Sequence, residues 1–322
     1  MLKSIRLEVL TVLSLPLLAA STGVRVAANS GVTRSSLNPQ QIALLKWYDV
    51  NQSISLLLPG SFASGIAFDG FHVWVTDTRG NTVTKVRTND GKLLGTFPVG
   101  KFPFSVAFDG ANIWTANFDS NTVSKLRASD GRLLGTFAVG NGASCLAFDG
   151  ANMWVTNRTD NSVTKLRASD GMALGTFPFG GTGVAFDGAN IWLPMQTSNS
   201  IVKLRASDGQ FLGNFSLPGH GPSGVAFDGE NVWVTFETGG GVAKVRASDG
   251  QVLAFRQVGG LSFGVVFDGE NIWVGAALSV FKVRASDAKV LGNFNIANTD
   301  APSLAFDGAN IWMAHDHFAS KL

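Results

Sequence analysis

The most suggestive chemistry in this chain is a short histidine cluster near its C-terminus. His315 and His317 flank Asp316, and in an extended strand the two imidazoles would lie on the same side. Two histidines can share a metal ion, but a metal site needs at least one further ligand. His220 and Glu237 are the candidates for that ligand. We predict no cofactor, with a divalent metal as the alternative; otherwise these are unrelated polar residues near a strand end.

Other features exclude whole classes of function. Cys145 is the only cysteine, so the chain forms no internal disulfide, and we expect a small buried hydrophobe rather than a nucleophile. The formal net charge is +2, and it comes from an N-terminal stretch with Lys3, Arg6 and Arg25; the remaining chain is close to neutral. Nucleic-acid-binding proteins usually carry a basic excess, so we expect no nucleic-acid partner.

A repeat of 38–41 residues dominates the rest of the sequence. Each copy contains Phe-Asp-Gly, with a Trp five residues after the Asp, and reads as four short strands separated by turns such as Asp149-Gly150. A repeat of this length and type is typical of a β-propeller. The triplets begin at Phe68, Phe108, Phe148, Phe186, Phe227, Phe267 and Phe306.

The ends of the repeat region predict how the ring closes. Residues 54–58 match only the fourth strand of a repeat, and residues 304–322 supply three strands and then stop. The predicted fold is therefore all-β, a seven-bladed β-propeller of four-stranded blades, in which an N-terminal strand completes the C-terminal blade. Closure of this kind removes exposed sheet edges at the junction.

The first 53 residues read differently. Lys3 and Arg6 precede an apolar run over residues 9–20, and residues 26–28 fit a cleavage site, so we predict a signal peptide over residues 1–28. Residues 29–53 form an extension with a short helix at about 39–48, and the propeller covers residues 54–322. The apolar run is short for a membrane span. We expect a secreted or periplasmic protein of bacterial type, a monomer with no integral span after cleavage; an uncleaved anchor is the alternative.

Length variation among the copies points to one face of the predicted disc. The Asp-to-Trp spacing is always five, whereas the step from Trp to the next Lys is 11 in five copies and 9 in two. All variable segments are loops between second and third strands or crossovers between blades, which lie at the same end, so we expect a site there. Its candidate residues are Phe104, Arg158, His220, Glu237, Phe263, His315, Asp316 and His317.

The repeated aromatic and basic residues are expected to serve the scaffold. The Phe and Trp of each copy should fill the spaces between blades, with a stacking platform for sugars or bases as the lesser alternative. A Lys-x-Arg pair recurs six times, for example at Lys125 and Arg127. We expect these pairs to bind the repeated Asp residues or to be solvated; the alternative is a basic groove for anions.

The repeat text resembles known bacterial propellers. The copy Val-Ala-Phe-Asp-Gly-Ala-Asn-Ile-Trp at residues 106–114 and the Trp-Val-Thr-Asn at residues 154–157 resemble the YVTN-type repeats of bacterial surface and periplasmic proteins. Residues 302–312 are similar to the last blade of the virginiamycin B lyase family, which has seven blades. The resemblance covers residues 54–322. It implies the fold but no particular activity, because these families serve unrelated functions.

The lyase resemblance also implies an activity that the residues do not support. Those lyases open a cyclic peptide antibiotic by Mg²⁺-assisted elimination, with a His just after a Pro on the inner strands and an acid four residues after a Trp. Glu237 and Asp316 match the acid position, but no residue at the His position can act as a general base near neutral pH. That position holds Ser64, Phe104, Ser144, Thr182, Ser223, Phe263 and Ser303.

Two functions therefore remain. The first is an exported, non-catalytic propeller that binds a protein, peptide or saccharide through its variable-loop face. The alternative is a metal-assisted lyase or hydrolase related to virginiamycin B lyase but with a different catalytic set, drawn from His220, Glu237, His315, Asp316 and His317.

Overall fold

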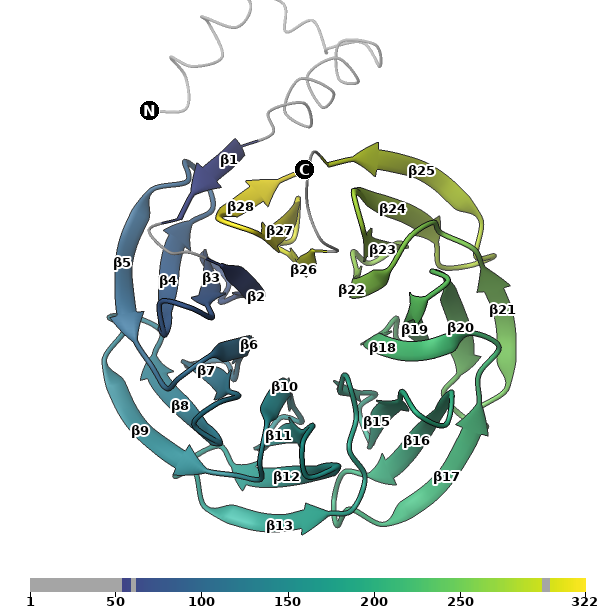
Figure 1. Ribbon diagram of the computed structural model, residues 1–322, viewed down its shortest axis with the longest axis horizontal. Helices are drawn as coiled ribbons and strands as arrows, with labels where there is room; N and C mark the ends of the chain where they lie inside the picture. Colours follow the sequence, from purple (N-terminus) through teal and green to yellow (C-terminus); the bar gives the residue numbers. More distant parts are fainter. Residues whose placement is uncertain (1–53, 59–61, 297–301) are drawn as a thin grey trace, which may run out of the picture. The chain divides into compact units, whose positions relative to one another are not determined.

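Each copy of the repeat forms one antiparallel four-stranded sheet, and the sheets are arranged in a ring (Figure 1). The computed structural model describes residues 54–58, 62–296 and 302–322, all in one unit of the chain that spans residues 47–322. Within these residues there are seven such sheets, which confirms the predicted seven-bladed propeller. The predicted signal peptide and N-terminal helix lie outside the described residues. In the part of the chain that is described, no helix has the length and hydrophobicity needed to cross a membrane.

The blades follow one another along the chain. Blades 1 to 3 consist of β2 (Ala63–Phe68), β3 (His72–Asp77), β4 (Thr82–Arg87) and β5 (Leu93–Pro98); β6 (Pro103–Phe108), β7 (Asn112–Asn117), β8 (Thr122–Arg127) and β9 (Leu133–Ala138); and β10 (Ala143–Phe148), β11 (Asn152–Asn157), β12 (Ser162–Arg167) and β13 (Ala173–Phe177). Blades 4 and 5 consist of β14 (Ala185–Phe186), β15 (Asn190–Met195), β16 (Ser200–Arg205) and β17 (Phe211–Ser216); and β18 (His220–Phe227), β19 (Asn231–Thr238), β20 (Val242–Arg246) and β21 (Val252–Arg256). Blade 6 consists of β22 (Ser262–Phe267), β23 (Asn271–Ala276), β24 (Ser279–Arg284) and β25 (Val290–Asn295).

Blade 7 is built from both ends of the chain. Its strands are β26 (Ser303–Phe306), β27 (Ile311–His315), β28 (Phe318–Lys321) and, as the outermost strand, β1 (Ile54–Leu57). β1 pairs antiparallel with β28, with Ile54 opposite Lys321 and Leu57 opposite Phe318. The first strands of neighbouring blades contact one another all round the centre, including β26 with β2 (Figure 1). The predicted closure is therefore confirmed.

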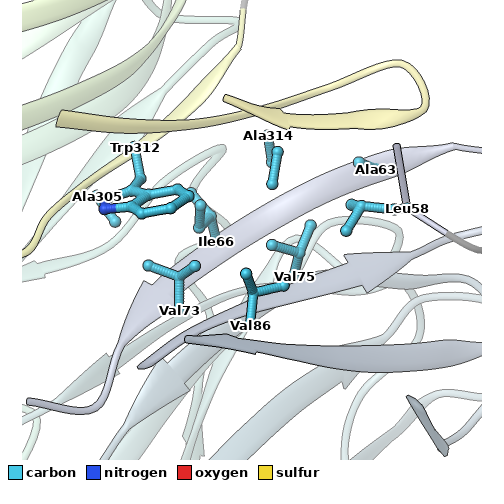
Figure 2. Packing of buried hydrophobic residues seen from close by; sticks show 10 residues of the cluster. Leu58, Ala63, Ile66, Val73, Val75, Val86, Ala305, Trp312 and Ala314 are labelled. Carbon is cyan, nitrogen blue, oxygen red and sulfur yellow. The ribbon is translucent and has the colours of Figure 1, made fainter. Parts of the chain in front are cut away.

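Apolar packing also holds the ring together where its ends meet. Trp312 and Ala314 of blade 7 lie against Ile66, Val73 and Val75 of blade 1 in one buried cluster (Figure 2). Trp312 is fully buried, and removal of such a side chain typically costs about 3–5 kcal/mol. Side-chain packing therefore adds to the four-residue pairing of β1 with β28.

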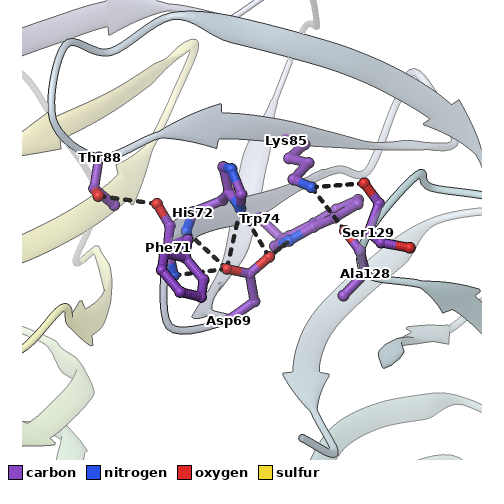
Figure 3. A network of polar contacts seen from close by, with 8 residues as sticks. All are labelled: Asp69, Phe71, His72, Trp74, Lys85, Thr88, Ala128 and Ser129. Carbon is purple, nitrogen blue, oxygen red and sulfur yellow. Dashed lines mark hydrogen bonds and ion pairs between the residues drawn. The ribbon is translucent and has the colours of Figure 1, made fainter. Parts of the chain in front are cut away.

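The fixed Asp-to-Trp spacing has a direct structural cause. Asp69 Oδ2 accepts a hydrogen bond from Trp74 Nε1 at 2.8 Å, while Oδ1 accepts from the backbone N–H groups of Phe71 and His72 at 2.9 and 2.7 Å (Figure 3). One carboxylate thus ties the turn between the first two strands to a buried indole. The same Trp-to-Asp bond, at 2.7–2.8 Å, occurs in every blade.

The repeated lysine connects neighbouring blades. Lys85 Nζ lies 5.2 Å from the centre of the Trp74 ring and donates to the carbonyl of Ala128 in blade 2 at 2.7 Å (Figure 3). This burial of the lysine was not predicted. The repeated arginine instead pairs with the Asp three residues later, as Arg127 does with Asp130 at 3.2 Å, so pairing is confirmed for that residue. Both basic residues are thus engaged by the scaffold.

Candidate functional site

A cavity of about 600 Å³ lies in the centre of the ring, and every blade contributes to its wall. In blade 1 the lining runs from Phe62 to Ile66, at the start of β2, where Ala63 pairs with Asp77 at the end of β3. Blade 7 contributes His315 and Asp316, at the end of its second strand. The cavity therefore lies toward the face that carries the loops between second and third strands, which is the variable-loop face of the sequence.

A β-bulge places one residue of the first strand at the wall. The register of the first two strands shifts at this point in blades 1, 2, 3, 5 and 6. Bulges re-aim side chains and are common beside functional sites. With the matching residue of blade 4, the bulge positions form a ring of cavity-lining residues, which we call the bulge ring: Ser64, Phe104, Ser144, Thr182, Ser223 and Phe263.

Blade 7 differs from the other blades here. The sequence predicts that Ser303, which follows Pro302, occupies the same position as the residues of the bulge ring. The short strand β26 has no register shift, and Ser303 lies opposite Ala314, just as Ser105 lies opposite Ala116 in blade 2. Ser303 still lines the cavity, but it occupies the position of Ser105 and not that of Phe104.

The hydroxyl groups of the bulge ring are used inside the protein. Ser64 Oγ donates to the Phe104 carbonyl at 2.9 Å, and Thr182 Oγ1 donates to the Pro222 carbonyl at 2.7 Å. Ser223 Oγ donates in the same way to the Ser262 carbonyl at 3.0 Å. These bonds join successive blades and take up the hydroxyl protons, so this part of the wall offers few free donors to a ligand.

A chain of polar side chains crosses three blades at the same face. Arg158 donates to Gln196 Oε1 at 3.3 Å, and Gln196 Nε2 donates to Glu237 Oε2 at 2.6 Å. Arg158 and Glu237 both line the cavity. Gln196 was missed by sequence reasoning, although it lies four residues after Trp192, just as Glu237 lies four residues after Trp233. The side-chain amide of Gln196 therefore links the Arg158 guanidinium to the Glu237 carboxylate.

Blade 7 contributes a different pair of groups on its side of the cavity. His315 is 8% exposed; its Nε2 lies 2.9 Å from Ser320 Oγ, and its Nδ1 has no hydrogen-bond partner among the described residues. Burial lowers the pKa of His315 below 6.5, against the opposing effect of the neighbouring Asp316 carboxylate. His315 is therefore neutral near pH 7, and the side chain of Asp316 makes no hydrogen bond or ion pair within the described residues.

The structure does not bring the proposed metal ligands together. β27 ends at His315, and Asp316 has a φ of 46°, so the chain turns at this residue and His317 does not continue an extended strand. This contradicts the expectation that His315 and His317 lie on one strand face. His220 and His317 are exposed and do not line the cavity. Within the described ranges, no three His, Cys, Asp or Glu side chains form a group that could hold a metal ion.

The remaining lining groups are mainly apolar. Phe104 and Phe263 lie in blades 2 and 6, and Leu261 and Phe263 expose 49% and 36% of their side chains. Cys145 also borders the cavity, where its Sγ lies 3.2 Å from the Thr182 carbonyl. Burial raises the pKa of this thiol to about 11, so it stays protonated near pH 7 and is a poor nucleophile.

The arrangement defines a class of protein: a seven-bladed propeller with a partly apolar cavity in the centre of its ring. Residues 96–274, more than half of the chain, match the family of the outer membrane protein assembly factor BamB, and the chain belongs to this family. No curated protein sequence matches the chain.

Solved structures with the same fold include proteins of different activity. The chain matches a Kuenenia stuttgartiensis hydrazine synthase and a streptogramin B lyase, each with 18% identity, a TM-score of 0.71 and 84% of this chain covered, over 97% and 96% of those chains. The selenomethionine-substituted virginiamycin B lyase from Staphylococcus aureus gives the same identity, TM-score and coverage of this chain, over 98% of its own chain. At this identity the likeness shows a shared fold alone, and it confirms the predicted relation in fold to virginiamycin B lyase.

Proposed function

We propose that this protein is an exported, non-catalytic propeller that binds a peptide, saccharide or protein ligand at its variable-loop face. The observation that carries the proposal is the central cavity of about 600 Å³, to which all seven blades contribute. Ligand sites typically have about 300–1,000 Å³ and combine apolar walls with a few polar groups. Here the apolar walls come from Phe104 and Phe263, and the polar groups are Arg158, Glu237 and Asp316.

Family membership supports the export and binding parts of this proposal. The family is described as the outer membrane protein assembly factor BamB, a description that refers to proteins of the outer membrane and to their assembly. The proposed signal peptide over residues 1–28 agrees with such a location. Since the cavity faces the variable loops, a protein ligand could insert a side chain or a chain end into it.

The proposal can be tested by narrowing the cavity. Ser64→Phe adds a ring at a bulge-ring position where blades 2 and 6 already carry Phe104 and Phe263, so the backbone there accepts this side chain. Thermal shift with a set of di- and tripeptides and of mono- and disaccharides should yield compounds that stabilise the wild type. Isothermal titration should then show that Ser64→Phe weakens each of them at least tenfold.

The matched control places the same ring on the opposite face. Ala111→Phe changes an exposed turn residue for which blade 1 has Phe71, which is 76% exposed. This variant should bind as the wild type does. Equal weakening by both variants, or no binding by the wild type to any member of the set, would count against the proposal.

The second candidate is a metal-assisted lyase or hydrolase with a catalytic set of its own. It is favoured by the presence of Glu237, His315 and Asp316 around one cavity and by the shared fold with streptogramin B lyase. It predicts Mg²⁺-dependent opening of a streptogramin B ring, followed by chromatography, that is lost in Glu237→Gln. If instead the protein leaves the antibiotic intact with and without Mg²⁺, binding remains the better account of the cavity.

A further inference from the structure

The charged groups around the cavity do not balance. Among the described residues, the charged side chains that line it are Arg158, Glu237 and Asp316, so this part of the wall carries one more negative than positive charge. Arg158 and Glu237 are joined through Gln196. The unmatched charge is therefore that of Asp316, on the blade 7 side.

Asp316 has no ion-pair partner among the described residues. Its neighbour His315 is buried and uncharged near pH 7, and the side chain of Asp316 accepts no hydrogen bond within the described residues. His315 also has a ring nitrogen, Nδ1, without a partner. A buried polar atom left unpaired is costly, and this one lies in a side chain that borders the cavity. Two polar groups of blade 7 in residues that line the cavity thus lack partners among the described residues.

The rest of the wall favours contact with an apolar part of a ligand and not with a charged part. Phe104 and Phe263 present ring surface, and the hydroxyl protons of Ser64, Thr182 and Ser223 are engaged between blades. A ligand body in contact with these residues gains most when it is apolar or aromatic. The phenyl faces also attract a cation that comes close to them.

We propose that the cavity takes a ligand with a cationic amine or guanidinium group on an apolar body, with the cation at Asp316 and the body against Phe104 and Phe263. This inference rests on the proposed binding function and adds the chemical class of the ligand. A carboxylate placed at the same point would meet Asp316 without compensation, so the site discriminates by charge as well as by shape.

Three probes with one body isolate the charge: 4-phenylbutylamine, 4-phenylbutanol and 4-phenylbutanoic acid. Titration calorimetry of the full chain at pH 7 should show the amine binding at least tenfold more tightly than the alcohol, and the acid most weakly. Asp316→Asn should reduce amine affinity at least tenfold and leave alcohol affinity unchanged. Asn is the suitable replacement because it tolerates the positive φ of this residue.

Asp170→Asn is the matched control, since it removes a carboxylate from an exposed turn outside the cavity and should leave amine binding unchanged. Equal binding of amine and acid, unchanged amine affinity in Asp316→Asn, or no binding of any probe would overturn the inference. The binding proposal is judged separately, because Ser64→Phe and Ala111→Phe test peptides and saccharides whatever their charge. Failure of the phenylbutyl probes alone leaves that result standing.

Discussion

The carboxylate that links turn and tryptophan should be a main source of blade stability, and Asp149→Ala tests this in blade 3. Asp149 accepts bonds from Trp154 Nε1 at 2.8 Å and from the backbone N–H groups of Ala151 and Asn152 at 2.9 and 2.7 Å. Trp154 is fully buried, so removal of the carboxylate leaves its indole N–H without this acceptor in a buried side chain. Ala151 is exposed, so water can replace the carboxylate at that bond.

These contacts set the size of the effect. A buried donor left without an acceptor costs about 1–3 kcal/mol, and loss of the turn bond to the half-buried Asn152 adds roughly 0.5–1.5 kcal/mol. We therefore expect Asp149→Ala to lower the free energy of unfolding by about 2–4 kcal/mol. For a protein of this size the melting temperature should fall by roughly 4–8 °C.

Urea denaturation followed by tryptophan fluorescence, together with calorimetry, measures both quantities. Asp170→Ala is the matched control, since Asp170 lies in the same blade and bonds in an exposed turn with Arg167 at 3.2 Å. Its loss should change the melting temperature little, because exposed ion pairs contribute little. The argument would be refuted by equal destabilisation in the two variants.

Three further predictions concern the same scaffold. Lys125→Met should lower the free energy of unfolding by about 1–3 kcal/mol in urea denaturation, because Lys125 Nζ donates to the Ala168 carbonyl at 2.6 Å and lies 5.1 Å from the centre of the Trp114 ring. Arg127 lies two residues away but is exposed, so Arg127→Gln should not lower it. Gly131→Ala should destabilise by about 1–3 kcal/mol more than Gly110→Ala. Both glycines have positive φ, but an added Cβ would clash with the Phe97 ring at Gly131 and would meet nothing within 4 Å at Gly110. The free energy of unfolding should decrease as the pH is lowered below about 3.8. Burial alone would raise the pKa of Asp149, but the hydrogen bonds from Trp154 and the turn outweigh burial and hold the pKa in the folded protein below 3.8. The unfolded chain therefore takes up the proton first as the pH falls. In an acid titration followed by circular dichroism, Asp149→Ala should show a smaller loss of stability.

The fold could be predicted because its main contacts recur in every copy. Asp149 and Trp154 lie in one hairpin, so their bond appears in the sequence as a constant spacing of five residues. The ring closure was equally visible, because an incomplete repeat at each end must be completed by the other. The role of Lys125 was not visible, since its acceptor, Ala168, is 43 residues away in the next blade.

The site was only partly accessible to the same reasoning. Variation in loop length pointed to the correct face for the cavity, and six candidate residues line it: Phe104, Arg158, Glu237, Phe263, His315 and Asp316. His220 and His317 do not, because β18 carries His220 to an exposed start of the strand and the chain turns at Asp316. Both failures come from local backbone geometry, which residue spacing alone does not reveal.

Residues that build the scaffold and residues that define the ligand have to be interpreted in different ways. A repeated residue has the same partner in each blade, so one blade is enough to interpret it. Gln196 can be interpreted only from its bonds to Arg158 and Glu237 on the two neighbouring blades, and Asp316 only from the lack of such a side-chain partner among the described residues. The positions four residues after each Trp carry seven different side chains, and three of these, Arg158, Glu237 and Asp316, line the cavity. The identity of the ligand therefore depends on how unlike residues of different blades combine around one cavity.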